Sequence, residues 1–135
     1  MKRGIAILAL CAAVLWGVIL LVPAPDRKDA GTTARVMAVS PGGLADAYQR
    51  NEVAADQRYR DQPVMVSGMV AEIGRGLAGG AYLILTGQGG AVRCEFPGKS
   101  EGQVAALAKG QSVTVQGTGA GLSMGMPRLK ECELP

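Results

Sequence analysis

The chain contains no histidine, and among its 135 residues it has only three tyrosines, one tryptophan and one phenylalanine. The absence of histidine removes the commonest general base, the serine–histidine catalytic pair and most zinc sites. No spacing singles out a catalytic pair among Glu72, Glu95, Glu131 and Glu133, so we expect solvated charges. We therefore predict a protein that is not an enzyme and that needs no cofactor.

Charge and aromatic content also disfavour nucleic-acid binding. The formal net charge is +3, and it falls to +1 once Lys2 and Arg3 are set aside. The remaining charges are interspersed, whereas a nucleic-acid binder usually carries a basic stripe. The aromatic residues outside the N-terminal segment are Tyr48, Tyr59, Tyr82 and Phe96. Four aromatic residues are too few for a convincing row of base-stacking platforms, so a nucleic-acid partner is not expected.

The N-terminal segment has the length of a membrane span. Residues 4–22, "GIAILALCAAVLWGVILLV", carry no charge, and as a helix they would extend roughly 28 Å. Lys2 and Arg3 precede the run, which places residues 1–3 in the cytoplasm and the rest of the chain beyond the membrane. We predict a single-pass anchor in the inner (cytoplasmic) membrane, with the C-terminal domain in the periplasm or outside.

A cleaved secretory signal is the alternative. The run is longer than the apolar core of such a signal, and the only cleavage-like site, Val22-Pro23-Ala24, has prolines at awkward positions. Lipidation is disfavoured because Leu10, not a small residue, stands before Cys11, and the apolar run continues well beyond it.

The next two segments are a linker and a helix. Residues 23–43 mix proline, glycine, threonine and charges without apolar periodicity, which is typical of a linker. Residues 44–59 place apolar side chains at roughly helical spacing, with a break expected near Asn51. The apolar stripe consists of Leu44, Ala47, Tyr48, Val53 or Ala54, and Tyr59. We expect this stripe to pack on the domain that follows.

From Pro63 onward the apolar period is two, as in strands. The expected strands are "VMVSGMVAEI", "AYLILT" at 81–86, "AVRCEF" at 91–96, "QSVTVQG" at 111–117 and "PRLKECEL" at the end. The residues expected to face inward are Val64, Val66, Gly68, Val70, Val92, Cys94, Phe96, Val113 and Val115. Residues 100–110 return to helical character, with Ser100 as a cap and Gly110 as a stop.

Five short strands cannot bury both faces of one flat sheet, but closing them into a barrel removes the exposed edges. Three strands, a helix and two strands is the order of the oligonucleotide/oligosaccharide-binding (OB) fold. We predict a mainly β domain over residues 44–135: a five-stranded OB-fold barrel with a helix between strands three and four, a preceding short helix, and an N-terminal transmembrane helix.

Several stretches of the predicted domain resemble one protein family. "AYQRNEVAADQRYRDQPVMVSGMVAEIG", "VRCEF", "LAKGQSVTVQG" and "LKECEL" are similar to the tRNA_anti-like OB-fold proteins, which are exported bacterial proteins of unassigned role. The resemblance covers about residues 44–134. It implies the fold, and it does not imply contact with tRNA.

Two cysteines lie in the predicted barrel. Cys94 and Cys132 are 38 positions apart, while Cys11 lies in the apolar segment. An oxidising compartment permits a bridge, so we predict a Cys94–Cys132 disulfide. Leu129 and Cys132 are three positions apart, so in a regular strand they would face opposite sides. A bulge must fall between them if both face inward. Two separate buried thiols, or a reactive or metal-binding pair, are the alternatives.

The predicted function is that of a binding module for an envelope protein or peptide. The candidate binding face lies on strands one to three and the loop at 74–81, with Tyr82, Arg93 and Arg75 as its residues. A single-stranded nucleic acid or a glycan on the same face is the alternative. The weakest alternative is periplasmic Cu(I) binding by Met124 and Met126, because thioethers bind Cu(I) but methionines more often fill gaps or sit in loops.

Overall fold

The computed structural model describes residues 35–135, so the predicted anchor at 4–22 lies outside the described residues. In chain order the elements are β1 (Met37–Val39), α2 (Pro41–Arg50), α3 (Glu52–Tyr59), β2 (Pro63–Arg75), β3 (Ala81–Gly87), β4 (Gly90–Glu95), η2 (Gly98–Ser100), α4 (Glu101–Ala105), β5 (Ser112–Ser123) and β6 (Met126–Glu133). Within residues 35–135, none of the helices combines the length and the apolar character needed to cross a bilayer.

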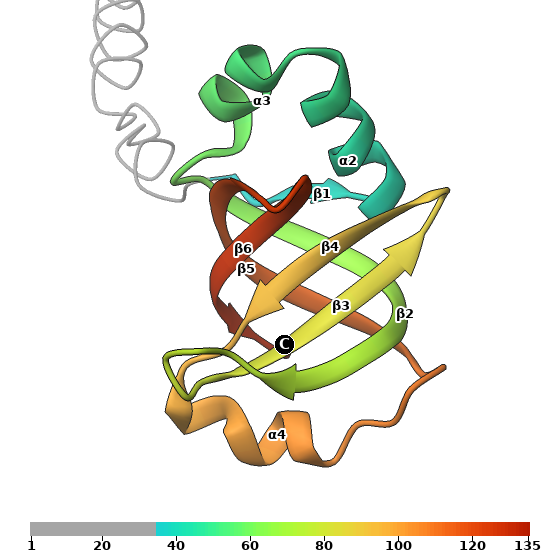
Figure 1. The fold of residues 1–135 in the computed structure, drawn as a ribbon, viewed down its shortest axis with the longest axis vertical. Coiled ribbons are helices and arrows are strands. Elements are labelled where there is room, and N and C mark those ends of the chain that lie inside the picture. Colours follow the sequence, from blue (N-terminus) through green and yellow to red (C-terminus); the bar gives the residue numbers. More distant parts are fainter. Residues whose placement is uncertain (1–34) are drawn as a thin grey trace, which may run out of the picture. The chain divides into compact units, whose positions relative to one another are not determined.

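Five of the strands form a closed ring. The order β2–β3–β4–β6–β5 returns to β2 through a β2–β5 pairing, and all neighbours are antiparallel except β4 and β6, which are parallel. Figure 1 shows the barrel with α2 and α3 at one end and α4 at the other. This is the OB arrangement, and the predicted mainly β barrel, with its helix between the third and fourth barrel strands, is confirmed.

The alternation of the strands produces the core. Of the residues expected inside, Val113 is partly buried and Gly68 half-buried, and the others are fully buried, together with Leu83, Leu85 and Leu129 from the remaining strands. Within the ring, β2 has two partners: its first half pairs with β5 and its second half with β3, with a register shift between Val70 and Glu72. A bulge here increases the twist of the strand, which lets one strand belong to both sides of the barrel.

A sixth strand was not predicted. β1 runs parallel to the start of β2, with Met37 opposite Val64 and Val39 opposite Val66. Residues 37–43 are therefore not part of the predicted linker. They form β1 and the first turn of α2, which starts at Pro41 after the Ser40 cap. Three strand residues are too few to show a period of two, and the glycines after Pro41 mask the start of the helix.

The break expected at Asn51 is confirmed. Asn51 ends α2 and begins α3, because its backbone is extended and its side chain accepts a hydrogen bond from the Ala54 amide at 3.1 Å. Leu44, Tyr48 and Tyr59 are buried as expected. Val53 and Ala54 are exposed instead, and Ala55 joins the core, because the helical phase restarts after the break.

Two glycines fit the helical pair closely against the barrel. A Cβ atom on Gly42 of α2 would lie 1.9 Å from the Gln88 carbonyl oxygen, at the β3–β4 turn. A Cβ atom on Gly119 of β5 would lie 1.9 Å from the Tyr59 carbonyl oxygen, at the end of α3. Backbone therefore meets backbone at both ends of the pair, where no side chain can be accommodated.

The helix expected over 100–110 is shorter than predicted. η2 and α4 together end at Ala105, and the buried Ser100 makes no capping hydrogen bond through its side chain. Gly110 has a φ of 85°, and its amide donates to the Val70 carbonyl at 2.7 Å. Residues 106–111 are thus drawn to the bulge of β2, which ends the helix early.

Tyr48 links the two helices. Its side chain is only 4% exposed, and its hydroxyl donates a hydrogen bond to Asp56 Oδ1 at 3.1 Å. Burial, reinforced by this hydrogen bond and by the charge of Asp56, raises the pKa of Tyr48 from 10.0 to about 12.

This pKa predicts a loss of stability in alkali. The unfolded chain releases the Tyr48 proton near pH 10, while the folded chain holds it to about pH 12. The stabilisation is therefore complete below pH 10 and is lost as the pH rises to about 12. Denaturant unfolding of the full chain should show that the free energy of unfolding falls between pH 10 and about pH 12. Tyr48→Phe should remove the part of this fall that comes from Tyr48. An identical pH dependence in both proteins would contradict the prediction.

Candidate binding groove

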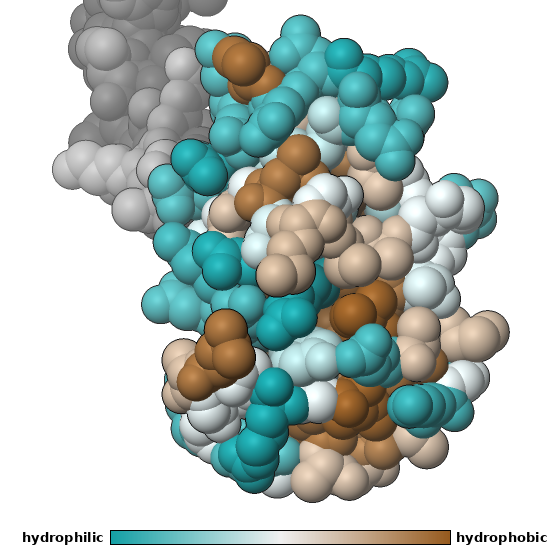
Figure 2. Space-filling model, in the orientation of Figure 1, coloured by the Kyte–Doolittle hydropathy of each residue, from teal (hydrophilic) through white to brown (hydrophobic). Residues whose placement is uncertain are grey.

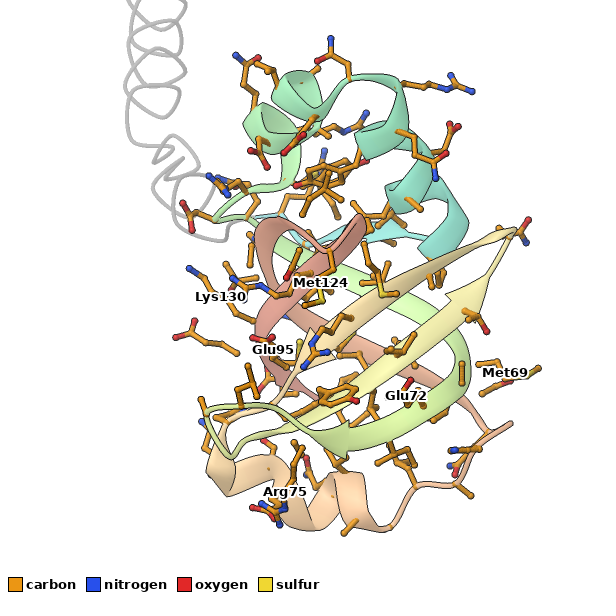
Figure 3. All side chains as sticks on the ribbon, in the orientation of Figure 1. Met69, Glu72, Arg75, Glu95, Met124 and Lys130 are labelled. Atoms are coloured by element: carbon orange, nitrogen blue, oxygen red, sulfur yellow. The ribbon has the colours of Figure 1, made fainter. Side chains whose placement is uncertain are left out.

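A groove of about 690 Å³ crosses the face formed by β3, β4 and β6. One wall is the β2–β3 loop, and the other is the β5–β6 turn. Its lining consists of Arg75, Gly76, Leu77, Ala78, Gly80, Ala81, Tyr82, Arg93, Glu95, Phe96, Ser123, Met124 and Arg128. In Figure 3, Glu95 lies between Met124 on one side and Arg75 on the other, with Met69 away to the far side of the barrel. We call this feature the groove.

Three charged side chains form the floor of the groove. Arg93 of β4 and Arg128 of β6 are register partners across the parallel strand pair. Glu95 Oε1 lies 3.3 Å from Arg93 Nε and 3.7 Å from Arg128 Nη1, so one carboxylate oxygen serves two guanidinium groups. Arg128 Nε is buried and has no hydrogen-bond partner. The floor therefore carries one positive charge more than its own carboxylate neutralises.

Tyr82 of β3 lies beside this floor. The guanidinium carbon of Arg93 lies 3.8 Å from the centre of the Tyr82 ring, and the ring occupies the space that a side chain on Gly74 would fill. The Tyr82 hydroxyl donates a hydrogen bond to Glu72, and this bond is the main cause that raises the pKa of Tyr82. The ring is thus fixed in place by the neighbouring strands on the barrel surface.

Arg75 lies at the edge of the groove, where β2 ends. Its guanidinium donates to Glu101 of α4 and to the Gly79 carbonyl, the latter at 3.0 Å. These contacts connect the β2–β3 loop to the helix below the barrel. The structure therefore places Tyr82, Arg93 and Arg75, the three residues predicted for the binding face, around one groove.

The walls of the groove are apolar at their tips. Leu77 in the β2–β3 loop and Met124 in the β5–β6 turn are both fully exposed. Met124 and Gly125 have φ values of 52° and 77°, as in a two-residue type I′ turn, while Met126 begins β6 and is half-buried. Figure 2 shows hydrophobic and hydrophilic residues interleaved over the barrel, whereas the end formed by α2 and α3 is mainly hydrophilic.

The turn at Met124 yields a prediction. Asparagine adopts positive φ far more readily than methionine, and Asn-Gly is a preferred type I′ pair. Met124→Asn should therefore raise the free energy of unfolding by about 0.5–1 kcal/mol. Denaturant titration of the full chain measures this change. A loss of stability would mean that Met124 is held by contacts that the turn geometry does not require.

The predicted binding face includes the loop at 74–81 but does not single out Leu77 within it. It leaves out Glu95, which is expected among the solvated charges, and Arg128. Arg128 joins the groove only because β6 runs parallel to β4, a pairing between strands that are distant in the sequence. The available signal was that each arginine precedes an inward-facing residue, since Arg93 comes before Cys94 and Arg128 comes before Leu129.

The two cysteines lie directly beneath the floor. Cys94 and Cys132 are fully buried, the structure holds both as free thiols, and the thiols are within hydrogen-bonding reach of each other. The expected bulge is confirmed, since the register slips between Lys130 and Glu133, with Glu131 at a φ of 52°. The neighbouring Cys94 thiol, together with burial, raises the pKa of Cys132, which opposes a role as a reactive thiolate.

Within residues 35–135, no three side chains of the histidine, cysteine, aspartate and glutamate types gather as a metal site. Met124 extends into solvent from its turn.

A family model and one solved structure support the fold. A family model described as tRNA_anti-like matches residues 1–133. No curated protein matches the chain. A proposed nucleic acid-binding lipoprotein from Klebsiella pneumoniae has a similar structure, with 20% identity, a TM-score of 0.63, and coverage of 83% of this chain and 98% of that one. The S. pombe Stn1–Ten1 complex gives 18% identity and a TM-score of 0.46, covering 54% of this chain and 57% of that one.

Proposed function

The chain belongs to the tRNA_anti-like family, and from this premise we propose that its barrel is a binding module and not an enzyme. The groove binds an extended segment of another envelope protein. Residues 4–22 anchor the module in the inner membrane, with the barrel on the periplasmic side.

One observation carries this proposal: the two walls of the groove each end in a fully exposed apolar side chain. Leu77 and Met124 stand on separate loops around one groove. OB folds bind their ligands on this face of the barrel, between these two loops. Single apolar side chains scattered over a surface are common and indicate no function. Exposed apolar side chains that line one groove are typical of an interaction surface.

The charges favour a protein segment over a polyanion. Arg75 pairs with Glu101, Arg93 and Arg128 share Glu95, and Glu72 lies beside them at Tyr82. Nucleic-acid affinity depends on basic groups that neutralise many phosphates, whereas the carboxylates here already neutralise most of the arginine charge. The absence of histidine supports a binding role over a catalytic one.

Single-stranded nucleic acid is the second candidate. Its support is the presence of three arginines around one tyrosine on the OB binding face. Against it, Arg93 covers Tyr82, so the ring is not free on that side to stack on a base.

The salt dependence of binding separates the two candidates. Full-length protein in detergent should show no binding of an oligothymidylate even at low salt. It should retain envelope proteins in a pull-down, and Leu77→Asp with Met124→Asp should abolish that retention. Val53→Asp, on the exposed surface of α3, is the matched control. If an oligonucleotide binds tightly and its affinity falls steeply with salt, the ligand of the groove is a nucleic acid and not a protein segment.

A further inference from the structure

We infer that Arg93 and Arg128 bind a carboxylate of the incoming segment, contributed by an aspartate or glutamate side chain. This inference rests on the proposed function, and it adds the chemical class of segment that the groove selects.

The first step is the charge of the floor. Arg93 and Arg128 face each other across the parallel pairing of β4 and β6, and like charges in such positions repel. Glu95 offers a single oxygen to both, at 3.3 Å from one arginine and at 3.7 Å from the other. The second of these distances is longer than a good hydrogen bond. Arg128 is therefore the guanidinium that the protein itself satisfies least.

The second step is the orphaned donor. Arg128 Nε is buried without a hydrogen-bond partner, although most buried polar atoms in proteins have one. A guanidinium group pairs best with a planar carboxylate, which can accept two parallel hydrogen bonds. Because Nε itself is buried, a carboxylate that reaches the floor would pair with the rest of the guanidinium group, whose side chain is 37% exposed, and would balance the excess positive charge.

The third step is the fixed position of Arg93. Arg93 is held over the Tyr82 ring, and Tyr82 is in turn held by Glu72. A guanidinium group whose orientation is set in advance loses less conformational entropy when it binds.

The walls determine what flanks the carboxylate. In an extended segment, residues two positions apart point to the same side. A carboxylate directed at the floor therefore brings residues two before and two after it toward the walls. Leu77 and Met124 are apolar, so the favoured segment is apolar–x–acidic–x–apolar. A chain of phosphates fits poorly, because only one guanidinium group of the floor lacks a carboxylate of its own and because three carboxylates lie close to the groove.

Blocked peptides test this inference on the full chain in detergent. The probe is acetyl-Leu-Ala-Asp-Ala-Leu-amide, compared with the same peptide carrying asparagine in place of aspartate. Side-chain ¹⁵N resonances of Arg93 and Arg128 report contact at the floor. We expect the aspartate peptide to shift both resonances and to bind about tenfold more tightly than the asparagine peptide.

Variants separate the carboxylate contact from the walls. Arg128→Gln should lower the affinity for the aspartate peptide about tenfold and so remove the preference for aspartate. Arg50→Gln, an exposed arginine of α2 that pairs with Asp46, is the control and should behave as the unaltered protein. Leu77→Ala should lower the affinity for both peptides by the same factor.

Failure of the inference is distinct from failure of the proposed function. Equal affinity for the two peptides, or no shift from the aspartate peptide at about 10 mM, overturns the carboxylate contact while envelope-protein capture through the groove still stands. If a peptide whose only carboxylate is its C-terminus binds more tightly than the aspartate peptide, the carboxylate in the groove does not come from a side chain. Binding of an oligothymidylate alone overturns both.

Discussion

Replacing Gly119 by alanine should lower the free energy of unfolding by about 2–3 kcal/mol or more, although only one methyl group is added. The new Cβ atom would lie 1.9 Å from the Tyr59 carbonyl oxygen and 2.7 Å from its carbon. These are backbone atoms at the end of α3, so no side chain can turn aside, and either the helix or β5 must move. Gly42→Ala should have a similar cost, because its Cβ atom would collide with the Gln88 backbone.

Gly102→Ala supplies the matched control for both substitutions. Gly102 lies in α4 with no atom within 4 Å of its Cβ position, so alanine there should raise stability by about 0.5–1 kcal/mol. Denaturant unfolding of the three full-length variants measures the difference. If Gly119→Ala and Gly42→Ala unfolded at the same denaturant concentration as the unaltered protein, the helical pair would not be packed on the barrel as described.

The second large effect is expected from the cysteines. Cys94 lies on β4 and Cys132 on β6, and the register of these two strands comprises only two residue pairs, Arg93–Arg128 and Cys94–Leu129. We predict that the two cysteines form a disulfide in an oxidising compartment. Closing a loop of 38 residues should then stabilise the fold by roughly 4 kcal/mol, less any strain. Reduction should lower the unfolding midpoint accordingly.

Thiol titration identifies the state of the pair. In a Cys11→Ala background, full-length protein purified from membranes and then denatured should contain no titratable thiol. Two thiols per chain, or a dimer that disappears on reduction, would rule out the intramolecular bridge. The pair would then be two buried thiols, which the raised pKa of Cys132 keeps protonated at neutral pH.

The sequence was most informative where one residue settled the local structure. Asn51 ended one helix and capped the next, as its side chain allows. The strands at 81–86 and 91–96 alternated clearly, so the inward position of Cys94 followed directly. The parity conflict between Leu129 and Cys132 required the bulge that the structure contains.

The remainder depended on contacts between distant segments. β1 is three residues long and exists because the start of β2 leaves an edge to pair with. α4 ends early because Gly110 bonds to the bulge of β2. Arg128 enters the groove through a parallel pairing that local periodicity cannot encode. Tyr82, Arg93 and Arg75 could be identified in advance, since they alternate with core residues or end the strand beside the loop.

The central claim is that the groove is where the partner binds, and site-specific photo-crosslinking in living cells tests it most directly. A photoreactive residue at Leu77 or Met124 should produce the same crosslinked envelope protein, because both side chains border one groove. Probes at Val53 on α3 and at Met69 on the far side of the barrel are equally feasible, since both positions are exposed, and should not produce it. A partner crosslinked from Val53 or Met69, with nothing from Leu77 and Met124, would contradict the account.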